Sequence, residues 1–233
     1  MRQKFLSIII VFFSLLSVSE LSAQEFFDTS DSEKFFTFSG RLGFNTSNKT
    51  FPTRTFNKWN HNSWGTGLNI GFLANLNFKE YLSLQPGIFV ESRSGDYSYL
   101  TEYINYAGQV DTHYEMGHLR GYYLTVPVMG IFKFNFSEHI KWSVEFGPYF
   151  QLGLKQTGVN NVIVIYRLPG SNNYSQYKAS HNTMDAGVKL GSGLQFYNHY
   201  YLGFHYLIGL CDAWKEPKGG RNKSWVFTLG YDF

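Results

Sequence analysis

Four side chains that can bind metal ions stand close together in the middle of the sequence: Asp111, His113, Glu115 and His118. Asp111, His113 and Glu115 occupy alternate positions, so in an extended strand they would share one face. Carboxylate and imidazole groups on one face could hold a divalent ion. The simpler interpretation is a solvated loop whose histidines are incidental, and we favour it. We therefore predict no metal and no cofactor, and keep these four residues as weak candidates.

A larger set of charged residues falls on the polar side of segments in which apolar and polar residues alternate. The set comprises Arg41, Glu91, Arg93, Lys133, Lys141, Glu145, Lys155, Asp185, Lys189 and Asp232. Opposite signs occur toward both ends of these segments, and buried charge is costly unless it is paired. We therefore predict a charge network that plugs an interior. A narrow ion path and a catalytic pair are the alternatives that the residue types leave open.

Two patterns resemble catalytic or nucleotide-binding motifs but lie in the wrong context. Gly191-Ser192-Gly193 falls inside an alternating segment, whereas a dinucleotide loop needs a strand-to-helix turn. A Ser-His-acid hydrolase of the nucleophile-elbow type needs a serine on such a turn, and no serine here has that setting. His205 lies on the polar side of its segment, where we expect hydrogen-bonded filler. We name no catalytic residue and predict that the protein is not an enzyme.

The segment 140–155, IKWSVEFGPYFQLGLK, indicates what kind of element carries these charges. Every even position from 140 to 154 is apolar, and the odd positions are mostly polar or glycine. A period of two is that of a β-strand, whose side chains alternate between faces. This apolar face is far longer than in an ordinary strand of about five residues, and it suits the roughly 9–11 residues of a strand crossing a bilayer. We predict that it contacts lipid.

Seven other segments alternate in the same way, so the expected strands are 36–45, 65–78, 81–94, 119–134, 140–155, 185–196, 200–210 and 224–233. Long polar connections follow the first, third, fifth and seventh strands, and short turns follow the second, fourth and sixth, as in outer-membrane barrels. Closure is required because an open sheet edge cannot be satisfied in lipid. We predict an all-β fold, an eight-stranded antiparallel up-and-down transmembrane β-barrel. A soluble ligand-carrying barrel, with its apolar face inside, is the alternative.

The first residues have the pattern of a cleaved secretory signal peptide. Arg2 and Lys4 precede an apolar run at 5–16, and small residues precede a cut expected after Ala23. The run is too short for a membrane helix, which needs about 20 apolar residues. The predicted division is a signal peptide at 1–23, a flexible periplasmic lead at 24–34 and an outer-membrane β-barrel at 35–233. We expect the bacterial outer membrane, with both the N- and C-termini of the mature chain in the periplasm.

Composition excludes several classes of partner and cross-link. Aromatic residues make up 19% of the chain and charged residues only 16%, which is low for a soluble surface. The net charge of +3 leaves no footprint for nucleic acid. The lone cysteine, Cys211, cannot form an internal disulfide. Tyrosines such as Tyr97, Tyr99 and Tyr103 enrich the expected outer loops, where they would contact lipid headgroups or bind a protein or glycan.

Four phrases, LSLQPGIFVES, YYLTVPVMGIFKF, EFGPYFQLGLK and DAGVKLGSGLQF, resemble the PorT-like outer-membrane β-barrel family of Bacteroidetes-type bacteria. The resemblance covers about residues 36–233 and rests on the order and spacing of short motifs. It implies an eight-stranded barrel. The last strand, WVFTLGYDF, resembles the signal read by the barrel-assembly machinery, which implies assembly roles for Trp225, Phe227, Leu229, Tyr231 and Phe233. The family's namesake serves a protein secretion apparatus, but no residue pattern in this chain indicates that role.

The leading functional hypothesis is an integral outer-membrane barrel with a plugged lumen and a structural or partner-binding role through its long outer loops. Its expected partners are outer-membrane lipid, the barrel-assembly machinery and a protein or glycan at the outer loops. The alternatives are a membrane-embedded lipid-modifying enzyme and a small passive channel. Loss of activity on substituting one inward acid or histidine would favour the enzyme, and measurable conductance would favour the channel.

Overall fold

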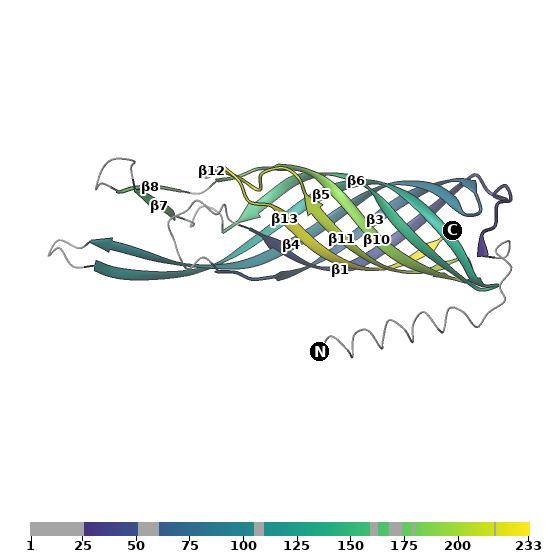
Figure 1. The fold of residues 1–233 in the computed structure, drawn as a ribbon, viewed down its shortest axis with the longest axis horizontal. Helices are drawn as coiled ribbons and strands as arrows, with labels where there is room; N and C mark the ends of the chain where they lie inside the picture. Colours follow the sequence, from purple (N-terminus) through teal and green to yellow (C-terminus); the bar gives the residue numbers. More distant parts are fainter. Residues whose placement is uncertain are drawn as a thin grey trace, which may run out of the picture.

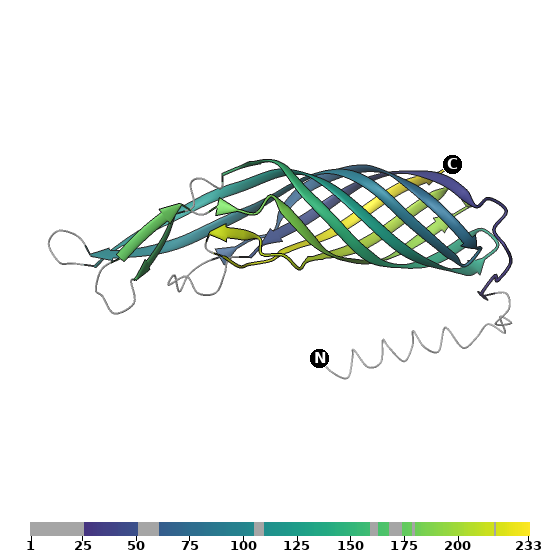
Figure 2. The same ribbon diagram turned by 90° about the horizontal axis from the view of Figure 1, so that it is seen from above.

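The computed structural model describes residues 26–50, 61–104, 110–158, 163–167, 174–178, 180–216 and 218–233. Eight long strands form the body of the molecule: β1 (Phe36–Lys49), β3 (Gly65–Lys79), β4 (Leu82–Ile104), β5 (Val110–Ser137), β6 (Ile140–Thr157), β10 (Met184–Phe196), β11 (Tyr200–Gly209) and β13 (Asn222–Asp232). Each pairs antiparallel with its neighbours in this order, and β13 pairs with β1. The sheet is therefore a closed barrel (Figures 1 and 2), which confirms the predicted fold class.

Five short strands among the described residues lie at one end of the barrel. They are β2 (His61–Asn62), β7 (Ile163–Arg167), β8 (Tyr174–Lys178), β9 (Ser180–His181) and β12 (Trp214–Glu216). β2 pairs with β4, β7 pairs with β8, and β9 pairs with β12. No helix in the described ranges has the length and apolar character needed to cross a membrane.

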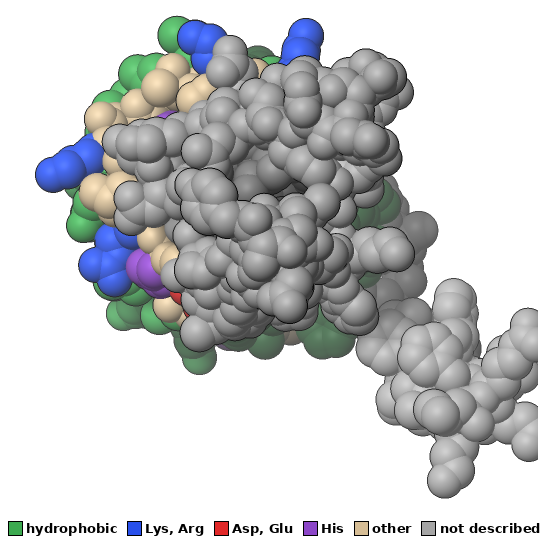
Figure 3. Space-filling model, turned by 90° about the vertical axis from the view of Figure 1, so that its left-hand side faces the viewer, with side chains coloured by type: hydrophobic (Ala, Val, Ile, Leu, Met, Phe, Trp, Pro, Cys, Tyr) green, Lys and Arg blue, Asp and Glu red, His purple; other side chains and the backbone are tan. Residues whose placement is uncertain are grey.

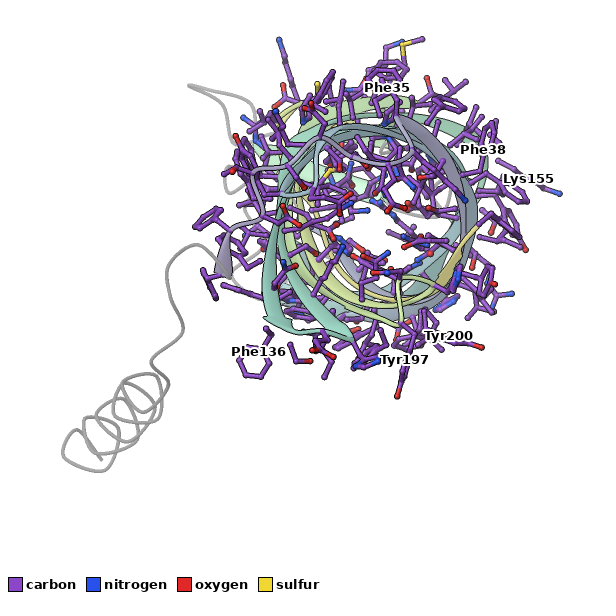
Figure 4. The ribbon with its side chains drawn as sticks, turned by 90° about the vertical axis from the view of Figure 1, so that its right-hand side faces the viewer. Phe35, Phe38, Phe136, Lys155, Tyr197 and Tyr200 are labelled. Carbon is purple, nitrogen blue, oxygen red and sulfur yellow. The ribbon has the colours of Figure 1, made fainter. Side chains whose placement is uncertain are left out.

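The barrel is apolar outside and polar inside, which inverts the arrangement of a soluble domain. In β6 buried and exposed residues alternate from Ser143 to Gln151, and the exposed set is apolar, with Phe146 50% exposed. Phe72 on β3 and Leu229 on β13 are likewise exposed. Figure 4 shows carbon-rich side chains outside the ring, while nitrogen and oxygen atoms line its interior. This arrangement suits an apolar solvent around the barrel.

An apolar patch occupies the middle of the interior. Tyr149, Leu207 and Val226 pack together there, and Met129 and Ile131 of β5 are also buried. The mixed polarity of residues 127–131 in the sequence is explained by this patch, because the inward face of β5 is apolar where the other strands supply polar groups.

The two ends of the barrel differ. At one end, which we call the turn end, tight turns join β3 to β4, β5 to β6 and β10 to β11, and both ends of the barrel segment lie there, with the Phe233 N–H donating to Phe38 O at 2.9 Å. At the other, the loop end, β4 and β5 continue together beyond the barrel wall as a long hairpin (Figure 1). Residues 95–118 were expected to be a polar loop, but most of them extend these two strands. The expected hairpin from the apolar run at 162–166 corresponds to β7 and β8.

The predicted signal peptide, 1–23, lies outside the described residues. The described part of the predicted lead, 26–34, contacts the turn end of the barrel. The Glu80 N–H donates to Ser30 O at 3.1 Å, and Lys79 pairs with Asp31 at 2.6 Å. Phe27 packs edge-on against Phe134, with ring centroids 4.9 Å apart. The lead thus borders the opening at the turn end.

Candidate functional site

Most of the charged residues predicted to face inward lie inside the barrel. Arg41, Glu91, Arg93, Glu145, Asp185 and Lys189 are buried. Lys133, Lys141 and Asp232 are partly buried nearer the turn end. Lys155 is exposed on the outside. The interior charges fall into separate clusters, and the one around Glu145 is the most completely hydrogen bonded.

Glu145 is the centre of a cluster in the half of the interior nearer the turn end. Its side chain is 3% exposed. Oε1 accepts hydrogen bonds from the Ser143 hydroxyl at 2.8 Å and the Tyr201 hydroxyl at 2.7 Å. Oε2 lies 2.8 Å from His205 Nε2. Because a carboxylate only accepts, His205 carries a proton on Nε2. We call Ser143, Glu145, Tyr201 and His205 the Glu145 cluster.

Glycines of the barrel wall make the Glu145 cluster possible. Along the hydrogen-bonded row Glu145 of β6 pairs with Gly191 of β10, which pairs with His205 of β11. A Cβ on Gly191 would lie 2.2 Å from His205 Cδ2, so the imidazole crosses directly over this glycine to reach the carboxylate. The Tyr201 ring covers Gly203 in the same way, at 2.4 Å from its hydroxyl oxygen. Side chains at either position would block these contacts.

Arg41 connects the Glu145 cluster to the turn end. Its guanidinium lies 4.1 Å above the centre of the Tyr201 ring and pairs with Asp232 at 2.6 Å. A second amino group donates to Tyr231 O at 3.3 Å. The other Asp232 oxygen, Oδ2, accepts a hydrogen bond from Gln195 at 2.7 Å. Arg41 and Asp232, both predicted to face inward, therefore form an ion pair, and Tyr201 links them to Glu145.

A second cluster lies nearer the loop end and is built around Arg93. Its guanidinium donates to Glu91 Oε2 through Nε at 2.9 Å and through Nη2 at 2.7 Å. Nη1 donates to Gln151 Oε1 at 3.2 Å, and the Gln151 amide donates to the Thr125 hydroxyl at 2.8 Å. Glu91 and Arg93 are thus paired with each other on β4, and the hydrogen bonds through Gln151 and Thr125 connect the Arg93 guanidinium to β6 and β5.

Two remaining interior charges have separate surroundings. Asp185 accepts hydrogen bonds from the Tyr149 hydroxyl at 3.2 Å and from Asn222 at 3.0 Å. The Lys189 ammonium lies 5.1 Å from the centre of the Phe89 ring, which is within the range of a cation–π contact. The structure therefore brings the predicted residues together in pairs and small groups rather than in one continuous network.

Lys155 corrects the predicted orientation. Strict alternation along β6 placed it inward, but it is exposed and points away from the barrel (Figure 4). The register explains why, since Tyr123 of β5 pairs with Gly153 and Tyr122 pairs with Lys155. Leu154 is the extra residue of a β-bulge, and a bulge shifts the alternation by one. Gln156 takes the inward place, where its Oε1 lies 3.5 Å from the Lys49 ammonium.

A cavity of about 550 Å³ opens at the turn end and reaches the Glu145 cluster. Its wall includes Arg41, Lys133 and Lys141, and residues 30–34 of the lead border it. Lys141 pairs with Glu80 at 3.0 Å, and Lys133 donates to Asn77 at 3.4 Å. Figure 4 looks into this opening. The cavity described at the loop end is far smaller, about 40 Å³.

A small cover lies over the interior at the loop end. Trp214 of β12 is completely buried, and its indole N–H donates to Thr50 O at 3.0 Å. The Lys49 ammonium lies 5.2 Å from the Trp214 ring. His181 of β9, which pairs with Trp214, is also shielded. Burial and the nearby charge of Lys49 lower the pKa of His181 to about 4, so this ring is neutral at pH 7.

The four metal candidates are placed on the β4–β5 hairpin. Asp111, His113 and Glu115 occupy alternate positions of β5, opposite Tyr103, Thr101 and Tyr99. Their side chains lie outside the described part of the structure. His118 contacts Asp96 through Nδ1. Among the described residues no group of three or more His, Cys, Asp or Glu side chains could hold a metal ion.

The chemistry of the Glu145 cluster is that of a satisfied buried anion. The hydroxyls of Ser143 and Tyr201 both donate to the carboxylate, and His205 uses its Nε2 in the same way. A nucleophile needs a base that accepts its proton, within about 3.2 Å. Neither hydroxyl has such a contact with His205, since Tyr201 lies 3.5 Å from it. The geometry holds a charge in place and prepares no nucleophile.

Two interior residues were missed in the sequence. Tyr201 lies on the inward side of 200–210 with Gly203 and His205, and that shared parity was the available signal. Trp214 falls in a segment expected to be a polar loop, and nothing in the local pattern distinguishes it. Its burial depends on contacts with Thr50 and Lys49, which are far away in the sequence.

Comparisons with known proteins point to one class of fold. A family model described as "Outer membrane protein beta-barrel domain" matches residues 22–214. No curated protein matches the sequence. The crystal structure of Ail, the attachment invasion locus protein of Yersinia pestis, in complex with the heparin analogue sucrose octasulfate, is similar at 12% identity and a TM-score of 0.39, covering 86% of this chain and 100% of that one.

Two other solved structures have comparable similarity. Neisserial surface protein A has 9% identity and a TM-score of 0.42, with 86% of this chain and 98% of that chain covered. The outer membrane protein OprG from Pseudomonas aeruginosa has 10% identity and a TM-score of 0.38, with 88% and 97% covered.

Proposed function

Because the chain belongs to the outer membrane protein β-barrel family, we propose that it is a non-conducting, non-enzymatic barrel that presents its loop-end hairpins at the cell surface to a partner. Its place is the bacterial outer membrane. The observation that carries the proposal is the contrast between an interior closed by side chains beyond the turn-end cavity and a hairpin that runs far beyond the barrel wall. The role belongs to the hairpin, and the barrel is its membrane anchor.

The proposed orientation puts the turn end in the periplasm and the loop end outside. It is supported by the short connections and both barrel ends at the turn end, because outer-membrane barrels have short periplasmic turns and longer outer loops. On this view residues 1–23 are a signal peptide that is removed after export. The final strand, which ends at Phe233, is the segment that the barrel-assembly machinery recognises.

The proposal that the barrel does not conduct is supported by the residues along its axis. Tyr149, Leu207 and Val226 pack together at the middle, and the ion pairs Arg41–Asp232 and Glu91–Arg93 lie on either side. Trp214 covers the loop end. An ion entering from the turn end would have to displace the Glu145 cluster and then cross an apolar layer. Eight strands give an interior that side chains can fill.

The proposal that the hairpin binds a partner is supported by its free backbone. β5 pairs with β6 only from Arg120 onward, so the segment 110–119 pairs with β4 alone among the described strands. An unpaired strand edge is a template for another chain. The sequence of the hairpin also contains several tyrosines, Tyr97, Tyr99 and Tyr103 in β4 and Tyr114 in β5, a residue type that binding surfaces use. We propose an extended protein segment or a glycan as the partner.

The conducting alternative is tested by planar-bilayer recordings of the refolded barrel. We expect no discrete current steps from the natural protein. The matched positive control is the triple variant Met129→Ser, Tyr149→Ser and Leu207→Ser, which removes the apolar layer and leaves the outer surface unchanged. Steps of the same size in both proteins would refute the sealed-interior proposal, and current in the variant alone would support it.

The partner-binding role is tested in intact cells by crosslinking and recovery of the barrel with whatever it contacts. One variant lacks residues 99–115, which shortens the β4–β5 hairpin without touching the barrel wall. The matched control lacks residues 163–178, which removes β7 and β8. A partner lost only with the first deletion supports the proposal. Equal recovery from both variants would show that the hairpin is not the binding surface.

We also propose that the chain is a PorT-like member of the family from a Bacteroidetes-type bacterium. The supporting residues are the ordered phrases LSLQPGIFVES, YYLTVPVMGIFKF, EFGPYFQLGLK and DAGVKLGSGLQF. They fall on β4, β5, β6 and β10, so the proposed motifs lie in the barrel wall. The test is to express the chain in a Bacteroidetes-type bacterium that lacks its own related protein and to measure whether the chain is displayed at the cell surface. Failure of display in that host would contradict the assignment.

A further inference from the structure

Two cations stand on the outer surface at the loop end of the barrel, on neighbouring strands. Arg120 of β5 and Lys155 of β6 are both exposed. Arg120 pairs with Thr157, and Tyr122 pairs with Lys155, so Arg120 and Lys155 are diagonal neighbours on the same face. Diagonal neighbours in a sheet are about 7–8 Å apart, within reach of long side chains. Their charged groups can therefore act on one ligand.

The outward position of Lys155 depends on the bulge at Leu154. Without the extra residue the alternation of β6 would turn Lys155 into the barrel, next to interior cations. The bulge places Leu154 and Lys155 on the outside together, with Leu154 55% exposed. Bulges often re-aim a side chain at a functional position. Here the effect is to put a cation beside the upper end of the apolar surface.

Neither cation has an acidic partner in the part of the chain that the structure describes. No ion pair there involves Arg120 or Lys155. The exposed carboxylate nearest along the pairing, Asp96, contacts His118. Among the described residues of the last loop and β13, Lys215, Lys218 and Arg221 are exposed as well. Figure 3 shows several Lys and Arg side chains along the left and upper edges of this end.

The level of the two cations is marked by the apolar residues below them. Tyr122, one step down β5 on the same face, is 45% exposed. Below it the exposed residues of β5 and β6 are apolar, including Val126 and Phe150. Tyrosine at the edge of an apolar belt lies at the lipid headgroups. Arg120 and Lys155 are therefore at the depth of headgroup phosphates.

We propose that Arg120 and Lys155 form a binding site for the phosphate groups of an outer-leaflet lipid, a refinement that rests on the loop end facing outward. Arginine binds phosphate through two parallel N–H donors, and lysine adds a point charge. Tyr122 and Leu154 supply apolar contact for the upper part of the acyl chains. The ligand class is a lipid with a phosphorylated headgroup. Its phosphate groups, rather than acidic side chains of the protein, neutralise the positive charges of Arg120 and Lys155.

The test measures binding of lipid A, a diphosphorylated glycolipid, to the refolded full-length barrel by native mass spectrometry from micelles. The test variant is Arg120→Gln with Lys155→Gln. The matched control is Lys34→Gln with Lys79→Gln, which removes the same charge at the turn end. Each basic residue near a membrane surface contributes roughly fivefold in affinity. We expect about 25-fold weaker binding in the test variant and less than a twofold change in the control.

Three results would overturn the proposal. The first is unchanged lipid A binding in the test variant, and the second is an equal loss in the control, which would reduce the effect to net charge. The third is equally tight binding of inorganic phosphate, lost in the test variant, which would assign the pair to a free anion. Weak binding of dephosphorylated lipid A to every variant supports the phosphate assignment.

The orientation is tested separately, so that the two proposals can fail independently. Binding in micelles does not depend on which way the barrel is inserted, whereas digestion of the β4–β5 hairpin by protease added to intact cells does. A protected hairpin with normal lipid A selectivity would refute the outward orientation, and with it the outer-leaflet assignment. A digested hairpin without lipid A selectivity would overturn the lipid site alone.

Discussion

Replacing Glu145 with alanine tests whether the interior charges stabilise the barrel as described. The substitution removes the acceptor of three hydrogen bonds, from Ser143, Tyr201 and His205. Breaking a buried charged network costs about 3–5 kcal/mol, because the partners keep the penalty of burial. The cavity at the turn end ends at this cluster, so water can reach some of the orphaned donors. We therefore expect a loss near the lower limit, about 3 kcal/mol.

Glutamine at position 145 should be milder, with a loss of about 1–2 kcal/mol. The amide oxygen can still accept from Ser143 and Tyr201, while the amide nitrogen faces His205 Nε2. That contact then requires the other tautomer of His205, with its proton on Nδ1. Nδ1 has no partner among the described residues, so the exchange leaves a buried donor unsatisfied. The loss in the glutamine variant thus measures the contribution of the His205 contact, and the further loss in the alanine variant measures the contacts with Ser143 and Tyr201.

The assay is reversible urea unfolding of the barrel in lipid vesicles, followed by tryptophan fluorescence. Glu138→Ala is the control, because Glu138 is exposed in the turn between β5 and β6 and should change stability by less than about 0.5 kcal/mol. A cycle that combines Glu145→Ala with Tyr201→Phe should show clear coupling. A loss below about 1 kcal/mol for Glu145→Ala, with the native slope retained, would refute the reasoning.

Three further predictions use other parts of the molecule. Phe146→Arg, near the middle of the outer face of β6, should cost about 2–4 kcal/mol in the same assay, and no loss would contradict its contact with lipid. Deleting Phe233 should lower the amount of folded barrel in cells, measured by heat-modifiable migration in gels, and normal levels would contradict its assembly role. His181 binds a proton more readily when unfolded, because its pKa falls from 6.5 to about 4 in the folded chain. Stability of the loop-end cover should therefore fall as the pH drops from 7 to 5, by about 1 kcal/mol after allowance for partial exposure. Hydrogen exchange around β9 and β12 measures this effect, and an equal pH dependence in His181→Gln would rule out His181 as its source.

Much of the barrel was predictable because its outer face obeys a single rule. Wherever a strand crosses lipid, nearly every second residue is apolar, so residues 140–155 and 224–233 could be assigned as strands by their pattern alone. The alternation of long and short connections then determined which ends lie together. The prediction for 95–118 was less successful, because polar and aromatic residues continue the strands above the membrane. There the strands are not surrounded by lipid, so their outer face need not be apolar.

The interior site was predictable as a set of inward charges but not as a set of contacts. The alternation along the strands predicted that Glu145 and Arg41 face inward, whereas the role of Tyr201 depends on Gly203 of its own strand and Gly193 of the adjacent strand, which leave room for its ring. Lys155 was placed on the wrong face because a bulge changes parity, and one extra leucine in an apolar run leaves no local signal. The charge pairing across strands follows from register, which alternation leaves undetermined.

The hairpin of β4 and β5 makes the barrel wall and the projecting tip one mechanical piece. β5 is 28 residues long, about 95 Å at 3.4 Å per residue, and its ladder with β4 runs from Leu82 opposite Phe132 to Ile104 opposite Val110. A force that pulls on the tip puts both strands under tension. The hydrogen bonds that join β4 to β3 and β5 to β6 resist this force, and because the force acts along the strands it is shared by many of these bonds at once. A cell held by this hairpin would be tethered through the wall itself, whereas β7 and β8 pair with none of the described barrel strands and share no such load.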